Sequence, residues 1–255
     1  MESLLGALGV LAVHINMKAI ILAAGVGKRL VGSVVEHPKC LLDLNGRTLL
    51  DRMLDALNEI GIVDITIVVG HLSEQIEQAL QGRSGVKTIF NPEFRKGAIL
   101  SLWAAREELD GDVLIMDADV LFPVEMLRRL VDSPSANCFL MDTNAANDGE
   151  AQMLMARAGR VLDITRGLRG DYDACGESIG FLKLGADGSR TLRGLLQRAL
   201  ADGKDGIEHE EVYPSLMREC EIGYVTAGDL PWLEIDFPED VVRAQALLKE
   251  QVTGS

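Results

Sequence analysis

Residues 18–30 read Lys-Ala-Ile-Ile-Leu-Ala-Ala-Gly-Val-Gly-Lys-Arg-Leu, an apolar run that leads directly into a glycine-rich loop and two cations. A continuous apolar run at 19–22 is expected of a parallel strand that is buried on both faces. Gly25 and Gly27 let the backbone approach a ligand closely, and their amides can face a phosphate or a base edge. The loop is neither a dinucleotide fingerprint, because the third glycine is missing, nor a P-loop. On spacing alone, an ordinary tight connection between a strand and a helix explains it equally well.

Strand-like and helix-like segments alternate after this loop. The spacing of apolar residues predicts strands at 19–22, 64–69, 86–90 and 113–116, with helices at 48–60, 73–80 and 98–109 between them. This order predicts an α/β protein with a mostly parallel central sheet, right-handed crossovers and helices on both faces. Ligands of such sheets bind at the carboxyl ends of the strands.

The second half of the chain predicts a smaller and more antiparallel region. Strand candidates lie at 138–141, 152–156, 161–165, 179–184 and 222–226, and helix candidates at 123–131, 191–201, 210–218 and 241–250. The sequence contains no repeat and no low-complexity linker. We therefore expect residues 1–16 to be a poorly ordered N-terminal extension, and residues 17–255 to form a single domain.

The composition limits the partners of the protein. The chain of 255 residues has 25 Lys and Arg against 39 Asp and Glu, a net charge of −14. Such a surface repels nucleic-acid backbones, so an anionic ligand needs local cations, backbone amides or a metal. The apolar stretch at 4–15 is shorter than the roughly 20 residues that span a bilayer, so we expect no membrane partner. The 4 cysteines are widely spaced, which disfavours a zinc ribbon and is typical of reduced thiols in a cytoplasmic protein.

Three further stretches carry side chains suited to phosphate and metal chemistry. Lys39 follows Pro38, and a lysine that leaves a rigid loop can neutralise a phosphate. Asp117 and Asp119 follow the apolar strand at 113–116, where carboxylates suit Mg²⁺. Glu234 and Asp236 share one face of a short strand before Pro238. Each has a plain structural alternative: a solvated lysine, a capped strand end, and a helix N-cap at Asp236 or Phe237.

Taken in order, these stretches resemble the nucleotidyltransferase superfamily that makes NDP-sugars and NDP-alcohols. The resemblance covers residues 17 to about 250 and rests on L-A-A-G-x-G-x-R-L from Leu22, Pro38-Lys39, Asp119 and E-x-D-x-P-E-D from Glu234. Within the superfamily the chain is most similar to the phosphocholine cytidylyltransferase-type branch, and also to inositol-phosphate cytidylyltransferases, through residues 91–94, 101–102, 117–119, 176–180, 208–211 and 230–236. The resemblance implies a Rossmann-like nucleotidyltransferase fold with a smaller antiparallel region on the acceptor side.

The resemblance also implies an activity and a set of site residues. It implies Mg²⁺-dependent transfer of CMP from CTP to phosphocholine, phosphoethanolamine, 2-aminoethylphosphonate, inositol 1-phosphate or a similar acceptor, with release of pyrophosphate. It implies catalytic roles for Arg29, Lys39, Asp119 and Asp236, with Asp119 and Asp236 holding Mg²⁺ and Asp117 as the fallback metal ligand. The nucleotide is expected to contact Leu22, Ala23, Ala24, Gly25, Gly27, Lys28, Arg29, Asn91 and Ser101. The acceptor is expected to contact Lys39, Glu177, Glu210 and Glu211, with Trp103, Tyr172 and Trp232 as candidate walls.

Several alternatives stay open. One is an NDP-sugar pyrophosphorylase that uses UTP or dTTP and a hexose 1-phosphate, and another is a catalytically inactive binding subunit of the same fold. The head group of the acceptor is also open. A quaternary ammonium favours aromatic walls, a primary amine favours carboxylates, and a polyol phosphate needs neither. A homodimer is left open as the assembly state.

Overall fold

The central sheet is built around β1 (Lys18–Ala23) in the computed structural model, which describes residues 16–27, 30, 37–145, 149 and 151–253. β1 pairs in parallel with β2 (Asp64–Val69) on one side and with β4 (Val113–Asp117) on the other. β3 (Val86–Phe90) extends the sheet in parallel beyond β2. This parallel block confirms the α/β class that the alternating segments predict.

β9 (Ala174–Leu184) joins the parallel block to the second half of the chain. It runs antiparallel to β4 and, on its other side, antiparallel to β6 (Cys138–Asp142), which β10 (Gly223–Thr226) then extends in parallel. The strand order is therefore β10-β6-β9-β4-β1-β2-β3. The hairpin of β7 (Gln152–Arg157) and β8 (Arg160–Arg166) pairs with the amino-terminal half of β9. These strands form the smaller antiparallel region that the sequence predicts.

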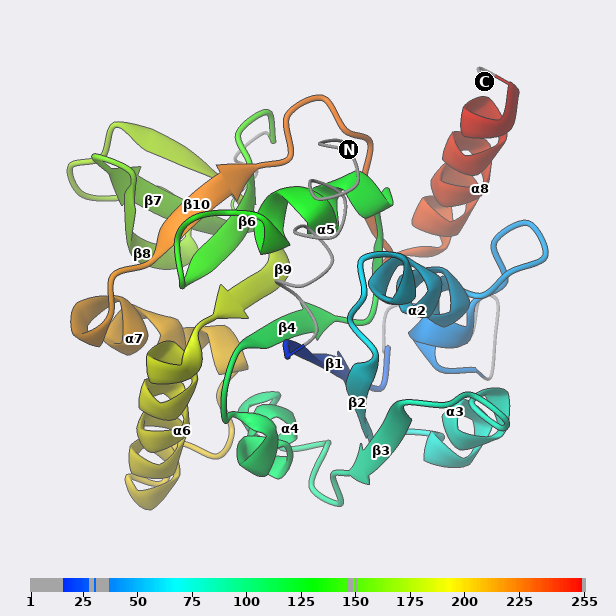
Figure 1. The fold of residues 1–255 in the computed structure, drawn as a ribbon, viewed down its shortest axis with the longest axis horizontal. Helices are drawn as coiled ribbons and strands as arrows, with labels where there is room; N and C mark the ends of the chain where they lie inside the picture. Colours follow the sequence, from blue (N-terminus) through cyan, green and yellow to red (C-terminus); the bar gives the residue numbers. More distant parts are fainter. Residues whose placement is uncertain (1–15, 28–29, 31–36, 146–148, 150, 254–255) are drawn as a thin grey trace, which may run out of the picture.

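Helices cover both faces of the sheet because its strands are buried on both sides. Along β1, Ala19 and Ile21 point into one core and Ile20 into the other. The first core receives α2 (Leu49–Glu59), α3 (Ser73–Ala79) and α5 (Val124–Val131), and the second receives α4 (Ile99–Ala104), α6 (Ala186–Ala201) and α7 (Tyr213–Glu219). Figure 1 shows α2 and α5 on one side of the strands, with α4, α6 and α7 on the other.

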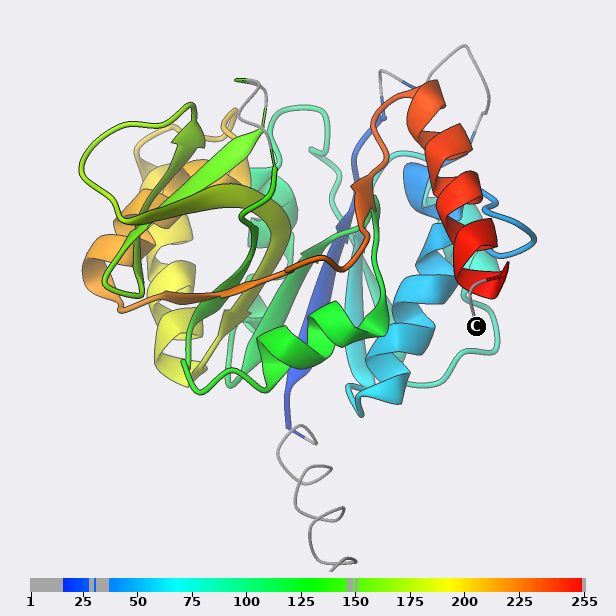
Figure 2. The ribbon, with the colours of Figure 1, turned by 90° about the horizontal axis from the view of Figure 1, so that it is seen from above.

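α8 (Pro238–Thr253) packs on a third and smaller core, where it buries Val241 and Ala244. This core lies beside a second sheet in which β5 (Val120–Leu121) pairs antiparallel with β11 (Leu233–Glu234). Figure 2 shows α8 and the β7–β8 hairpin on opposite sides of the upper end of the sheet, which is where β1 ends. Among the described residues, no helix combines the length and the apolarity needed to cross a membrane.

The largest differences from the expected elements concern two split helices and the starts of α6 and β9. The helix expected at 98–109 ends at Ala104 and is followed by the 3₁₀ turn η2 (Arg106–Glu108). The helix expected at 210–218 is split into η3 (His209–Val212) and α7, because Pro214 lacks the N–H group that a continuous helix needs. α6 and β9 begin earlier than expected, and both additions contain glycines that lower helix or strand propensity. The extension expected at 1–16 lies outside the described residues apart from Asn16, and the single-domain prediction remains a prediction.

Candidate active site

Two adjoining clefts lie beyond the carboxyl ends of β1 and β4. The first has a volume of about 650 Å³ and extends from the glycine-rich loop to α4. The second has a volume of about 760 Å³ and extends from the β7–β8 hairpin to α8. Both clefts are lined by the same charged residues where they meet, namely Lys39, Asp117, Glu208, Glu210, Glu234 and Asp236. A reaction between two bound molecules can therefore take place at this junction.

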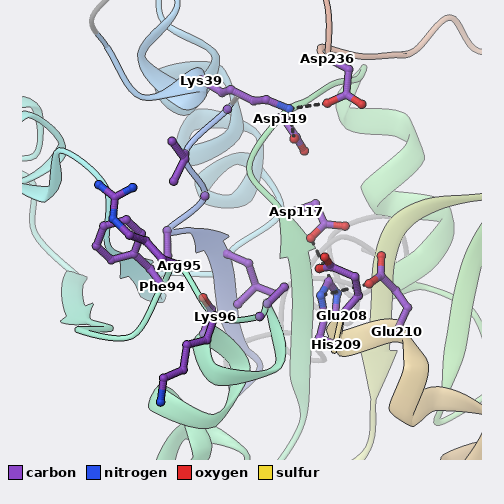
Figure 3. Close-up of a pocket in the computed structure, with 18 of the residues that line it drawn as sticks. Lys39, Phe94, Arg95, Lys96, Asp117, Asp119, Glu208, His209, Glu210 and Asp236 are labelled. Atoms are coloured by element: carbon purple, nitrogen blue, oxygen red, sulfur yellow. Dashed lines mark hydrogen bonds and ion pairs between the residues drawn. The ribbon is translucent and has the colours of Figure 1, made fainter. Parts of the chain in front are cut away.

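Lys39 lies at the junction because the local backbone directs it there. It follows Pro38 and begins the 3₁₀ turn η1 (Lys39–Leu41). Gly27 has a φ of +62°, and a Cβ at that position would lie 3.1 Å from Cγ of Lys39, so the glycine leaves room for the lysine stem. The lysine Nζ donates to Asp119 Oδ2 at 3.1 Å and to Asp236 Oδ1 (Figure 3). Burial alone would lower the pKa of Lys39, but the two carboxylates outweigh it and raise that pKa.

Asp119, Glu234 and Asp236 form a first group of carboxylates, whose oxygens lie within 4.8 Å of one another. Asp119 lies between β4 and β5, and its carbonyl oxygen accepts from the N–H of Ile235 at 2.9 Å, which joins the two halves of the group. Glu234 stays accessible from the clefts. Partial burial and the charges of Asp119 and Asp236 raise its pKa to about 8, and Lys39 opposes this rise. Hard oxygen donors this close together fit a divalent cation such as Mg²⁺. The ammonium of Lys39 already bridges two of them, Asp119 and Asp236.

Asp236 lies two residues before the start of α8. Oδ2 of Asp240 accepts from the backbone N–H groups of Asp236 and Phe237, at 3.1 and 2.9 Å. Asp240, in the first turn of α8, therefore satisfies the two N–H groups just before the helix. The side chain of Asp236 accepts from the lysine Nζ, a contact that a helix N-cap alone does not explain.

Asp117, His209 and Glu210 form a second charged group, below the first in Figure 3. The imidazole Nε2 lies 3.8 Å from Asp117 Oδ1, and Nδ1 lies 3.3 Å from Glu210 Oε2. Burial, with the charges of Glu210 and Asp119, raises the pKa of Asp117 well above its usual range. Gly180 has a φ of +76°, and a Cβ there would collide with the Asp117 carboxylate. The sequence named Asp117 only as a fallback ligand and assigned no role to His209.

The predicted nucleotide residues divide into three sets. Leu22, Ala24, Gly25, Gly27 and Ser101 line the first cleft. Ala23 and Asn91 do not line it. Ala23 is buried in the core, and buried Asn91 donates from Nδ2 to Ser101 Oγ at 3.1 Å, so it positions a lining residue. Lys28 and Arg29 lie outside the described residues.

Residues 94–96 also line the first cleft, although the sequence assigned them no role. They follow β3, which neighbours β2 in the parallel block. Their position after the carboxyl end of a parallel strand is the sequence feature that could have identified them. The guanidinium of Arg95 lies 5.0 Å from the centroid of the Phe94 ring, and Phe94 itself packs on Gly70. Lys96 pairs with Glu93 and Asp205 and points away from the carboxylates (Figure 3).

The predicted acceptor residues divide as well. Glu177 and Glu210 line the second cleft, but Glu211 lines neither cleft. Its Oε1 accepts from the backbone N–H of Glu208 at 3.0 Å, so it caps η3. The three aromatic residues predicted to contact the acceptor do not line either cleft: Trp103, Tyr172 and Trp232. Arg166 and Arg243 do line the second cleft, from β8 and α8, and the sequence analysis missed them.

Solved structures define the class of protein to which this fold and site belong. The CTP:phosphocholine cytidylyltransferase of Streptococcus pneumoniae superposes with a TM-score of 0.72 at 25% identity, over 91% of this chain and 99% of that one. An inositol-1-phosphate CTP transferase from T. maritima superposes with a TM-score of 0.75 at 19% identity, over 91% of this chain and 96% of that one. The fold is therefore that of the nucleotidyltransferases, as expected.

The family follows from the sequence comparison. The model of the MobA-like NTP transferase domain matches residues 19–179, and the chain belongs to this family. A choline-phosphate cytidylyltransferase of Streptococcus pneumoniae is 41% identical over 114 residues, which is 44% of this chain and 49% of that protein. A 2-aminoethylphosphonate cytidylyltransferase of Lancefieldella rimae is 29% identical over 162 residues, 63% of this chain and 65% of that protein. These alignments span about half to two thirds of the relatives' own lengths. They confirm the resemblance to the cytidylyltransferase branch.

Proposed function

We propose that the protein transfers CMP from CTP to a small alcohol phosphate or phosphonate and releases pyrophosphate. The observation that carries the proposal is that Lys39 and Asp236 lie where the two clefts meet, and that Lys39 also bonds Asp119 on the side of the first cleft. The first cleft begins at the glycine-rich loop, whose amides suit a nucleotide triphosphate. The second cleft is the place for the acceptor. The names of the cytidylyltransferase relatives support CTP as the nucleotide.

The chemistry needs charge neutralisation and positioning. An oxygen of the acceptor phosphate or phosphonate attacks the α-phosphorus of CTP in line and forms a new P–O bond. The bond from the α-phosphorus to the bridging oxygen of the β-phosphate breaks, and pyrophosphate leaves with that electron pair. Both reactants are anionic, so Lys39 would orient them and offset their repulsion. An ionised acceptor oxygen needs no general base, so the proposed reaction requires no Ser/His/Asp or Cys/His arrangement.

Asp119 and Asp236, with Glu234 beside them, are the residues that would hold Mg²⁺. The ion would supply positive charge against the phosphates. The three side chains offer oxygen donors from two segments that the backbone bond between Ile235 and Asp119 keeps together. Lys39 reaches the same pair of carboxylates, so the chain itself shows that this pair attracts a cation.

The remaining nucleotide contacts are assigned by position. Gly25 and Gly27 line the first cleft, and their backbone amides would approach the phosphates or the base. Lys28 and Arg29 continue this loop and are proposed to bind the triphosphate. Arg95 enters the same cleft from the end of β3 and adds a cation that the sequence analysis did not assign.

The proposal includes an environment and a set of partners. The partners are CTP and a small phosphorylated acceptor, with no nucleic acid and no membrane, and a homodimer remains open. Cys40, Cys138, Cys175 and Cys220 are all unpaired thiols, which supports the predicted cytoplasmic location.

Pyrophosphate release from the purified full chain tests the proposal. CTP, UTP, dTTP, ATP and GTP are each combined, with Mg²⁺, with phosphocholine, phosphoethanolamine, 2-aminoethylphosphonate, inositol 1-phosphate and hexose 1-phosphates. We expect turnover with CTP and one acceptor class. Turnover with UTP or dTTP and a hexose 1-phosphate would instead support the pyrophosphorylase alternative. CTP binding without turnover in any combination would support an inactive binding subunit.

A further inference from the structure

We infer that the acceptor carries a primary ammonium group, which Asp117, His209 and Glu210 bind. The inference rests on the proposed function and narrows it to one class of acceptor, a short aminoalkyl phosphate or phosphonate. Four observations support it: the composition of the junction between the two clefts, an unpartnered histidine nitrogen, the distance between the two charged groups, and the positions of the aromatic residues.

The junction of the two clefts is rich in carboxylates that do not pair with the lysine. Asp117, Glu208, Glu210 and Glu234 line both clefts, and Glu177 lines the second. Lys39 is committed to Asp119 and Asp236, and Arg243 donates to Asp240 at 3.0 Å. The group formed by Asp117 and Glu210 therefore favours a positively charged ligand.

His209 provides an independent sign of a ligand at this group. Its side chain is only 7% exposed and lies beside Glu208, Glu210 and Asp117 (Figure 3). Nδ1 is buried and has no hydrogen-bond partner, although it is 3.3 Å from a Glu210 oxygen. A buried polar atom without a partner is costly. His209 lines the first cleft at the junction and lies between Asp117 and Glu210. An ammonium has three N–H donors, enough to bond an oxygen of each carboxylate and one further acceptor.

The spacing of the two charged groups suits a short zwitterion. Asp117 belongs to the ammonium site and Asp119 to the carboxylate group that Lys39 contacts, and they are two residues apart in the chain. Their Cα atoms are therefore separated by at most about 7 Å. A phosphate or phosphonate at Lys39 and an ammonium at Asp117 need only a short alkyl chain between them.

The positions of the aromatic residues argue against a quaternary ammonium. The chain has 6 Phe, 2 Trp and 3 Tyr, and all of them are among the described residues. Of these, Phe94 lines the first cleft and Phe237 lines the second, at the start of α8. The ring nearest to His209 is Tyr213, which is buried behind it and lines neither cleft. A trimethylated nitrogen prefers several aromatic faces and cannot donate hydrogen bonds, so this cleft suits it poorly.

The first test uses the unmodified protein with CTP, Mg²⁺ and acceptors that differ only at nitrogen. The series is phosphoethanolamine, its N-methyl and N,N-dimethyl derivatives and phosphocholine, with 2-aminoethylphosphonate compared with ethylphosphonate. We expect kcat/KM to fall along the series, by about tenfold or more from the primary to the quaternary amine, because charge-assisted hydrogen bonds are lost. Equal or better turnover with phosphocholine, inositol 1-phosphate or ethylphosphonate overturns the inference and leaves the proposed function intact. Absence of turnover with every acceptor overturns the proposed function itself.

The second test assigns the effect to the residues. Glu210→Gln keeps the shape of the side chain and removes its charge, and Glu125→Gln makes the same change on the exposed start of α5. We expect Glu210→Gln to raise KM for the primary amine by about tenfold or more, to change KM for CTP much less, and to reduce the preference over ethylphosphonate. Equal acceptor KM values in the two variants, with unchanged circular dichroism, contradict the assignment.

Calorimetric titration distinguishes an ammonium site from a metal site. 2-Aminoethylphosphonate is titrated into the protein without nucleotide, and Mn²⁺ alone is titrated separately. We expect the heat of amine binding to be lost in Glu210→Gln and kept in Glu125→Gln. If Glu210→Gln instead removes a Mn²⁺ site that Glu125→Gln retains, the group is a metal site and the inference is wrong.

Discussion

Asp236 contributes to the reacting junction through one carboxylate that faces Lys39, Asp119 and Glu234. Asp236→Asn keeps the shape of the side chain and removes one charge from the proposed metal ligands and from the partners of the lysine. We expect kcat to fall by roughly a hundredfold or more, because charge stabilisation of this kind contributes several kcal/mol. The measurement is pyrophosphate release at saturating CTP, acceptor and Mg²⁺.

A matched variant separates this effect from a general change in charge. Asp110→Asn removes a carboxylate from an exposed turn before β4, outside both clefts. We expect its turnover to match that of the unmodified protein. Full turnover of Asp236→Asn at saturating Mg²⁺ would contradict the role of the carboxylate pair.

Gly180 fixes the position of Asp117, since its φ is +76° and a Cβ would meet the carboxylate. Gly180→Ala should cost of order 1–3 kcal/mol of folding free energy and displace Asp117. Gly82→Ala is the matched control, because Gly82 has a φ of +81° and nothing lies within 4 Å of the position of its Cβ. Thermal unfolding should show a loss in both variants, and KM for the acceptor should rise only in Gly180→Ala. A rise of similar size in both would show that Gly180 does not position the carboxylate.

The sequence could identify site residues only where a strand end or a motif marked them. Lys39, Asp119 and Asp236 were found this way, although the bonds from Lys39 cross 80 and 197 positions of the chain. Glu210 and Glu211 could not be distinguished, because which of two neighbouring residues faces a cleft depends on how the 3₁₀ turn η3 packs. The tryptophans were misjudged for a similar reason: Trp232 Nε1 donates to Asp142 Oδ2 at 2.8 Å, and Trp103 stacks on Arg106. Neither contact can be seen from spacing.

At the scale of elements, α2 shows how one side chain starts a helix. Thr48 is the N-cap, and its Oγ1 accepts from the backbone N–H of Asp51 at 3.0 Å. Thr48→Ala should lower the free energy of unfolding by about 1 kcal/mol, a loss of roughly 2–4 °C in Tm for a chain of this size. Thermal unfolding measures it, with Thr48→Ser as the control that keeps a hydroxyl. Equal losses of Tm in both variants would show that the hydrogen bond to the Thr48 hydroxyl does not stabilise the start of α2.

Most elements could be predicted because their apolar periodicity is strong. β2 and β3 occur with the bounds that the sequence predicts. Errors arose where tertiary contacts override local preference. The first half of β9 contains Gly176, which packs on the backbone of Asp142, so this half forms a strand because β6 and β7 pair with it. The two-residue strand β5 exists only as the partner of β11 and has no periodicity of its own.

At the scale of the whole molecule, the first cleft joins segments that are distant in the sequence. The glycine-rich loop, Phe94, Asp119 and Asp236 all line it. A bound nucleotide should therefore stabilise the native state as a unit. CTP with Mg²⁺ at 100 times its Kd should add about 2.7 kcal/mol, or roughly 5–10 °C in Tm. Differential scanning fluorimetry measures this shift, and we expect UTP at the same concentration to give a smaller one. Equal shifts would contradict the preference for CTP.

The architecture of the sheet could be predicted only for its parallel half. The alternation of strands and helices predicts the block of β1 to β4, since each crossover has a preferred hand. The insertion of β9 between β4 and β6 depends on pairings between distant segments that no local pattern records. β9 helps to line the second cleft. The sequence therefore predicted the residues of this cleft less completely than those of the first.

The attachment of the β7–β8 hairpin has an evolutionary consequence. Among the described strands, the hairpin forms a ladder with the rest of the sheet only through β9, yet its residues Gln152 and Arg166 line the second cleft. The parallel strands that carry the glycine-rich loop and Asp117 make no ladder with it. Mutations in this hairpin can therefore alter one wall of the second cleft while the residues that line the first cleft stay unchanged. A protein with this arrangement can acquire a new acceptor during evolution while its reaction stays the same.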